Sequence, residues 1–168
     1  MQLFLTSPDY NQCAKDLDDK RLNKIIVESA QIASTALWMN NCDAAETITS
    51  NGLCYLPTHE KHPLCIWAAS SYRNYLEVLR HGLALCKEYT FRTRKIHKTF
   101  NIIDHLRWGV FPFNFKFQEY PTQQPNCTTN HKHIDDVYKA YRLELLFKWA
   151  NDKKAPTWTN RQRPNWED

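Results

Sequence analysis

A stripe of polar side chains runs along one predicted helix, which extends from Leu17 to Asn40. At 100° per residue its members follow at steps of three and four: Lys20, Lys24, Glu28, Gln31 and Thr35. One interpretation is a solvated face with a Lys24–Glu28 pair, worth a few tenths of a kcal/mol. The other is the wall of a site in which Glu28 is the functional carboxylate. Such a carboxylate could carry a proton or bind the hydroxyl groups of a ribose.

Two histidines precede a predicted helix start in the segment THEKHP. Pro63 suits the first turn of a helix, whose unpaired N–H groups and positive dipole end favour an anion. His59 and His62 could donate to a phosphate there, or could serve only as helix caps. With Cys54 and Cys65 they form the pattern C-x4-H-x2-H-x2-C, which lacks the close cysteine pair of most structural zinc sites. We expect neither a metal nor a cofactor.

Basic and aromatic side chains alternate in the segment YTFRTRKIHK, a mixture that suits a phosphate backbone with a stacked base. Arg92 and Lys98 are the candidates for phosphate contacts, and Tyr89 is the candidate for stacking. The alternative is a solvated basic turn.

The C-terminal tail offers a second set of this kind. Trp158 could stack on a base and Arg161 could bind a phosphate. The alternative, which we favour for the tryptophans, is a C-terminal strap that packs them on the core.

The elements that must position these side chains are predicted to be helices. The sequence predicts an all-α fold: a single compact helical domain over 1–168, with one long early helix, a second long central helix and an irregular C-terminal tail, 151–168, packed on it. Ser7 is predicted to cap the first helix, and Ser70-Ser71 to interrupt the central one. Helices are expected over about 8–16, 17–40, 64–93, 100–107 and 134–150, with irregular loops over 41–62 and 109–132.

Composition narrows the class of protein. The chain has 168 residues, 42% of them hydrophobic, so one domain with a real core is expected. Only 3 glycines are present, too few for a dinucleotide-binding fingerprint. A net charge of +4 is compatible with an anionic partner, either DNA or a small phosphorylated nucleotide. The 6 cysteines include no C-x-x-C pair, and no apolar run could span a membrane, so we expect reduced thiols and a cytoplasmic protein.

Four segments carry a resemblance: DDKRLNKIIVESAQIASTA, THEKHPLCIW, ALCKEYTFRTRKIHK and PTWTNRQRPNW. They resemble a widespread family of small phage-encoded proteins and, more distantly, the pyrimidine-dimer DNA glycosylase (endonuclease V) group. The resemblance implies an all-helical fold, with Glu28 matching a catalytic Glu and His62-Pro63 matching a His-Pro before a long helix. In that group the α-amino group exposed after Met removal attacks C1′ of the sugar. Because Gln2 is large, we expect Met1 to be retained, with its amine as the candidate nucleophile.

Two functions follow as hypotheses. The first is a phage-encoded DNA N-glycosylase acting on a modified or damaged base, with or without lyase activity. Met1 would be its nucleophile, Glu28 its proton carrier, and Arg92 and Lys98 would hold the DNA. The alternative is a non-catalytic nucleotide-binding protein, expected to be a homo-oligomer, that sequesters a (cyclic) nucleotide signal of host antiviral defence in the host cytoplasm. A helical protein that binds only a protein partner ranks last.

Overall fold

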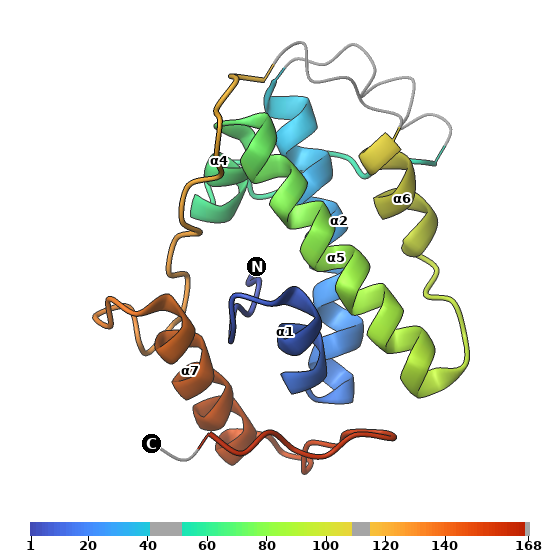
Figure 1. The fold of residues 1–168 in the computed structure, drawn as a ribbon, viewed down its shortest axis with the longest axis vertical. Coiled ribbons are helices and arrows are strands. Elements are labelled where there is room, and N and C mark those ends of the chain that lie inside the picture. Colours follow the sequence, from blue (N-terminus) through green and yellow to red (C-terminus); the bar gives the residue numbers. More distant parts are fainter. Residues whose placement is uncertain (41–51, 109–114, 167–168) are drawn as a thin grey trace.

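The computed structural model describes residues 1–40, 52–108 and 115–166. Within these residues the chain forms helices and no strand, so the predicted all-α class is confirmed (Figure 1). The helices are α1 (Tyr10–Asp16), α2 (Asp19–Met39), α4 (Pro63–Ala69), α5 (Tyr72–Thr93), α6 (Phe100–Trp108) and α7 (Val137–Asn151). None of these helices is long and apolar enough to cross a bilayer.

The two long helices, α2 and α5, pack against each other and form the centre of the fold. An apolar face of α2 packs into the core, and all its members are buried: Leu22, Ile25, Ile26, Ala30, Ala33, Ala36 and Leu37. Gly82 of α5 lies where α2, α5 and α6 meet. A Cβ atom there would be 3.1 Å from Ile103 Cδ1 and 3.2 Å from Ser29 Cβ, so glycine allows the close approach.

The starts of three helices depend on polar side chains. The predicted cap at Ser7 is wrong: Asp9 caps α1, with its carboxylate accepting from the Asn11 backbone N–H at 2.9 Å. The predicted break at Ser70-Ser71 is confirmed, because Ser71 caps α5 by accepting from the Asn74 backbone N–H at 3.1 Å. Asp136 caps α7, which therefore begins three residues later than position 134.

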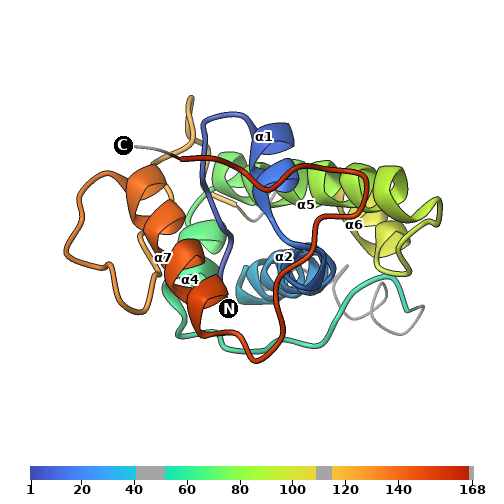
Figure 2. The same cartoon turned by 90° about the horizontal axis from the view of Figure 1, so that it is seen from below.

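The N-terminal arm and the C-terminal tail, as far as Trp166, lie against the helices. The first residues form an extended arm, in which Leu3, Phe4 and Leu5 are buried. The tail leaves α7, passes the N-terminal end of α2 and returns beside α1 (Figure 2). The Trp158 indole N–H donates to the Asp16 carbonyl at 3.1 Å, and the rings of Trp149 and Trp166 stack with centroids 5.5 Å apart. The tail thus packs its tryptophans on the core.

Two predicted loops are described only in part. Residues 52–62 and 115–132 contain no helix, while 41–51 and 109–114 lie outside the described residues.

Candidate active site

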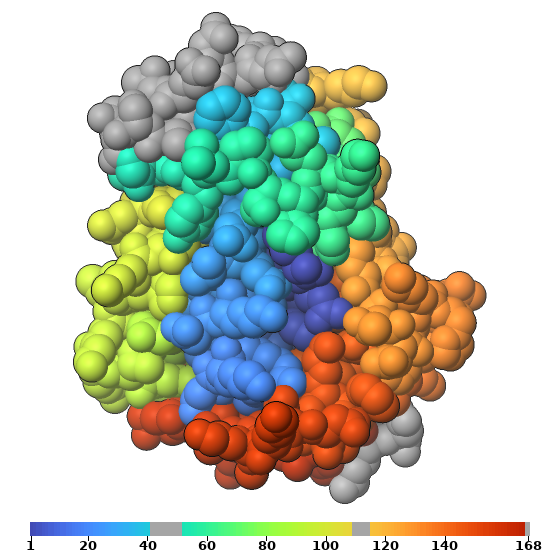
Figure 3. All heavy atoms as spheres, turned by 180° about the vertical axis from the view of Figure 1, so that it is seen from behind, coloured from blue at the N-terminus to red at the C-terminus, as the bar shows by residue number. Residues whose placement is uncertain are grey.

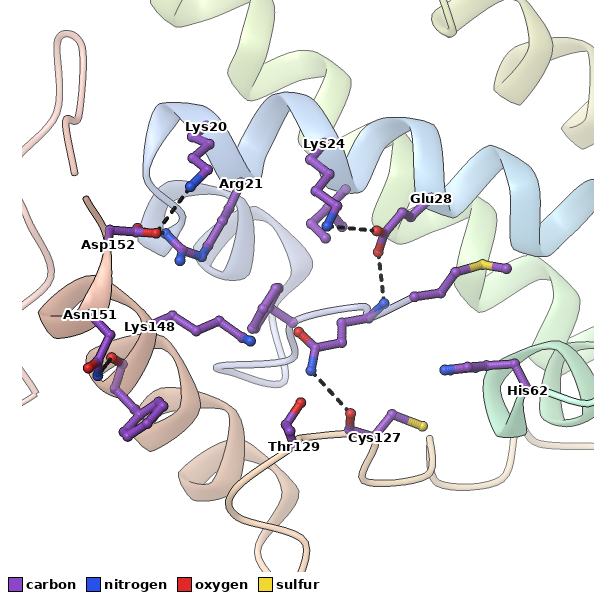
Figure 4. A pocket seen from close by; sticks show the side chains of 15 residues that line it. Lys20, Arg21, Lys24, Glu28, His62, Cys127, Thr129, Lys148, Asn151 and Asp152 are labelled. Carbon is purple, nitrogen blue, oxygen red and sulfur yellow. Dashed lines mark hydrogen bonds and ion pairs between the residues drawn. The ribbon is translucent and has the colours of Figure 1, made fainter. Parts of the chain in front are cut away.

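A cavity of about 560 Å³ lies between α2, the N-terminal arm and α7. Seen from behind, the dark-blue N-terminal residues lie at the bottom of this hollow, between α2 and the orange C-terminal segment (Figure 3). The side chains around it come from the arm, α2, the start of α4, the loop before α7, and α7 itself (Figure 4). They are Met1, Gln2, Phe4, Lys20, Arg21, Lys24, Ile25, Glu28, His62, Cys127, Thr129, Phe147, Lys148, Asn151 and Asp152.

Glu28 faces this cavity and holds the beginning of the chain. Its side chain is 12% exposed and pairs with Lys24, with Oε1 3.4 Å from Nζ. Its other oxygen, Oε2, accepts from the Gln2 backbone N–H at 2.8 Å (Figure 4). The Gln2 side chain in turn donates to the Cys127 carbonyl at 3.2 Å. The arm is therefore fixed at two points, and the main-chain nitrogen nearest the carboxylate belongs to Gln2.

His62 lies across the cavity from Glu28, at the start of α4. Its Nδ1 accepts from the Leu64 backbone N–H at 3.2 Å and so caps the helix. Burial lowers the pKa of His62, and the positive charges of the amino terminus and His59 lower it further, against the negative charge of Glu28 and a hydrogen bond with the Met1 backbone. The imidazole is therefore neutral near pH 7, with one nitrogen committed to the cap.

An ionic network joins α2 to the end of α7. Asp152 accepts from Arg21 at 2.7 Å and from Lys20 at 3.1 Å. Hydrogen bonds from Arg21 and Lys20 lower the pKa of Asp152, so the carboxylate stays charged. Arg21 also donates to both oxygens of Asp18 at 3.0 Å, and the Trp149 indole N–H donates to Asp18 at 3.2 Å. These bonds fix the position of α7 along the cavity.

Glu144 organises the opposite wall. Its Oε2 accepts from the Asn130 backbone N–H and from His131 Nδ1, each at 3.0 Å, and Oε1 is 3.1 Å from Lys148 Nζ. Burial alone would raise its pKa, but these hydrogen bonds outweigh burial and lower the pKa to about 2. One carboxylate thus holds both Lys148 and the loop that contains Cys127 and Thr129.

Only part of the predicted polar stripe lines the cavity. Lys20, Lys24 and Glu28 line it, whereas Gln31 and Thr35 do not. Thr35 is buried, and its hydroxyl bonds to the backbone N–H and C=O of Thr58, each at 3.1 Å. His59 is exposed, with Nδ1 2.7 Å from the Thr58 hydroxyl, and it lies outside the lining. These residues position the loop that leads to His62.

The basic and aromatic candidates farther along the chain also lie away from the cavity. Arg92 is 2% exposed and uses all its donors within the protein. They go to Glu88, Asp19 and the carbonyls of Leu17, Ala14 and Lys15. A phosphate contact would require breaking those bonds, so we leave Arg92 out of the site.

Three further candidates contact other side chains of the protein, and a fourth is exposed. Arg161 donates to both oxygens of Glu88, at 2.8 and 2.9 Å, and lies over the Phe91 ring. Tyr89 packs edge-on against His97, and Trp158 packs against Trp149. Lys98 is exposed, at a distance from the cavity lining.

Sequence reasoning missed one wall of the cavity. Phe147, Lys148, Asn151 and Asp152 come from α7, whose polar residues looked like an ordinary solvent-facing side. The available signal was Asp152, a carboxylate just after the helix end that needs a basic partner. In the part of the chain that the structure describes, no group of three or more His, Cys, Asp or Glu side chains is arranged to hold a metal ion.

Comparison with known proteins gives one match. The family model described as "Pyrimidine dimer DNA glycosylase" matches residues 1–102. This range contains the N-terminal arm, Glu28 and His62, but ends before the loop and helix that form the opposite wall. No curated protein and no solved structure matches the chain.

Proposed function

The chain belongs to the pyrimidine dimer DNA glycosylase family, and on that premise we propose that it is a DNA N-glycosylase. One observation carries the proposal: the amino-terminal main chain lies on the Glu28 carboxylate, 2.8 Å away, inside a cavity. The nitrogen in this contact is the Gln2 amide, and the Met1 amine is one residue away. An amine and a carboxylate in the same cavity can supply a nucleophile and a proton carrier for one bond.

The proposed reaction exchanges one bond at the sugar for another. The amine lone pair attacks C1′, and the glycosidic C1′–N bond breaks with its electron pair on the base, which takes up a proton. The attacking nitrogen then loses its protons as the sugar ring opens to an imine, and the ring oxygen takes one of them. Glu28 is placed to carry these protons between nitrogen and oxygen.

The amine that attacks depends on the first residue of the mature chain. With Met1 present, the Met1 amine is the nucleophile and the Gln2 nitrogen is an amide that positions the arm. In a chain without Met1, the Gln2 nitrogen is itself the amine and already lies 2.8 Å from Glu28 Oε2. The intact mass of the purified protein distinguishes these two forms.

The cations around the cavity would hold the DNA backbone. Lys20 and Lys24 are 73% and 68% exposed at one side, and Lys148 lies on the other. Ammonium groups in this position suit phosphates on both sides of a displaced nucleotide. The cavity between them is large enough for a base and its sugar.

The test uses a duplex with a single cyclobutane pyrimidine dimer and an undamaged duplex of the same sequence. We expect cleavage of the glycosidic bond only in the damaged duplex, read as an abasic site at the dimer, because the detached base stays joined to its neighbour through the cyclobutane ring. Glu28→Gln should lower the single-turnover rate of this cleavage by about 100-fold or more. Glu119→Gln is the matched control, because Glu119 is exposed and outside the cavity. An unchanged rate in Glu28→Gln, with the fold intact by circular dichroism, would contradict the proposal.

A second candidate function rests on the charge of the same cavity. Four cationic side chains and two carboxylates line a volume of about 560 Å³, which is within the usual range for small-ligand sites. The cations are Lys20, Arg21, Lys24 and Lys148, and the carboxylates are Glu28 and Asp152. A phage protein could use it to sequester a host nucleotide signal, with subunits sharing the ligand. Chromatography of the supernatant from heat-denatured protein would then show intact nucleotide. If calorimetry detects no heat of binding for any mono-, di- or cyclic nucleotide, this candidate function is excluded.

A further inference from the structure

A second hollow, of about 520 Å³, lies between the N-terminal arm, α1, α7 and the tail. Met1, Gln2 and Phe4 line the first cavity, whereas Thr6 and Ser7 line this one, so the arm passes from one to the other. Four cationic side chains line the second hollow, from three separate segments: Lys15, Arg142, Arg161 and Arg163.

The hollow has a strongly positive balance of charge. Among the residues that the structure describes, its single acidic lining residue is Asp16, which is 3% exposed. Both of its oxygens are occupied, by the Thr6 hydroxyl at 2.6 Å and the Gln12 amide at 2.8 Å. Burial raises the pKa of Asp16, against its two hydrogen bonds and the positive charges of Arg142 and Lys15, which lower it.

Arg142 is held by its Nε, and its outer nitrogens are available. The Nε–H donates to the Thr6 carbonyl at 2.8 Å, which fixes the guanidinium against the arm. Arg142 forms no ion pair with any carboxylate that the structure describes. The two terminal nitrogens therefore offer four N–H groups to an acceptor in the hollow.

Arg163 is held by aromatic rings. Its guanidinium carbon lies 5.4 Å from the centre of the Trp149 ring and 5.8 Å from that of Trp158. Within 1–40, 52–108 and 115–166 it likewise has no carboxylate partner. A guanidinium ordered by stacking loses little conformational entropy when it binds an anion. Arg161 differs, because Glu88 accepts both of its donors.

We propose that this second hollow is a phosphate-binding site, with Arg142 and Arg163 as its ligands and Lys15 at its edge. A phosphate group has enough oxygens to accept from two guanidinium groups and an ammonium group at once, whereas a carboxylate has only two. The site is separate from Glu28 and does not depend on the glycosylase proposal. Its phosphate is either a diester of a DNA strand or a free monoester.

The probe is inorganic phosphate, added to the full chain at constant ionic strength with chloride as the reference anion. Tryptophan fluorescence reports binding, because Arg163 lies on Trp149 and Trp158. We expect a saturating change for the wild type, and affinities at least about tenfold weaker in Arg142→Gln and in Arg163→Gln. The matched control is Arg94→Gln, since Arg94 also lies over an aromatic ring, at 5.7 Å from Phe91, but lines neither hollow.

A second experiment, with an undamaged duplex, identifies the source of the phosphate. If the site holds the DNA backbone, Arg163→Gln weakens duplex binding and inorganic phosphate competes with the duplex. If it holds a free monoester, both arginine variants lose phosphate binding while duplex affinity is unchanged. Both results support the site. Absence of a saturating change in the wild type, or equal phosphate affinity in the wild type and both folded arginine variants, overturns it. Neither experiment uses damaged DNA, so a failure of the phosphate-site proposal leaves the glycosylase proposal unaffected.

Discussion

His81 makes the stability of the fold depend on pH in a way that can be calculated. The side chain is 1% exposed, and neither ring nitrogen has a hydrogen-bond partner among the described residues. Its nearest aromatic neighbour is Tyr10, whose ring centre lies 5.3 Å away. Burial lowers the pKa of His81 from 6.5 to about 4. The folded protein therefore keeps the imidazole neutral, while the unfolded chain protonates it near pH 6.5.

The sign of the effect follows from this difference. Stability from the neutral imidazole is fully present above pH 6.5 and is lost as the pH falls toward 4, because protons then bind the unfolded chain preferentially. For these two pKa values, the loss at pH 4.5 is about 2.5 kcal/mol, and at pH 7.5 it is close to zero. The side chain is almost wholly buried, so solvent screening does not reduce this figure appreciably.

The perturbation is His81→Leu, which keeps a side chain of similar size and removes the titrating group. Urea unfolding of wild type and variant at pH 7.5 and pH 4.5 gives four free energies of unfolding. The advantage of the variant should grow by about 2.5 kcal/mol between the two pH values. His62, His97 and Asp16 also titrate, but they are common to both proteins and cancel. A difference that stays constant within about 0.5 kcal/mol would refute the reasoning.

Three further outcomes test the packing of the helices and the charge around the cavity. Arg92→Lys leaves buried acceptors without donors and should lower the free energy of unfolding by about 3 kcal/mol, measured in urea; a loss below about 1 would contradict the role assigned to Arg92. Gly82→Val forces atoms against Ile103 and Ser29 and should cost about 1–3 kcal/mol, seen as a lower melting temperature; an unchanged melting temperature would rule out the close helix contact. The double change Lys20→Gln, Lys24→Gln should reduce the slope of log affinity for duplex DNA against log salt by about 2, and an unchanged slope would place the DNA elsewhere.

The sequence predicted helices well where apolar spacing and capping residues agree. The extent of α2, the break at Ser70-Ser71 and the start of α4 at Pro63 all follow from local patterns. The first cap was misplaced because Ser7, Pro8 and Asp9 all favour a helix start, and the choice between them depends on where the arm enters the core. Local propensity does not contain that information.

The sequence predicted only the part of the site that lies on a single helix. Helix periodicity brings Lys20, Lys24 and Glu28 onto one line, but it cannot show where another segment covers that line. The loop that bonds to Thr35 covers the C-terminal half of the stripe. Only the part of the stripe up to Glu28 therefore lines the cavity. Arg92 illustrates the same limit, because its partners on α1 and α2 become visible only when the helices pack. The α7 wall depends on the Asp152–Arg21 bond across 131 positions of sequence.

We propose that the amino terminus and Glu28 together form the reacting pair. The most direct measurement is borohydride reduction of the protein during reaction with the dimer-containing duplex, followed by digestion and mass spectrometry of the cross-linked peptide. We expect the sugar on the α-nitrogen of the first residue, and a loss of this adduct when two residues are added before Met1. An adduct on Lys20, Lys24 or Lys148, or equal trapping by the extended chain, would contradict it.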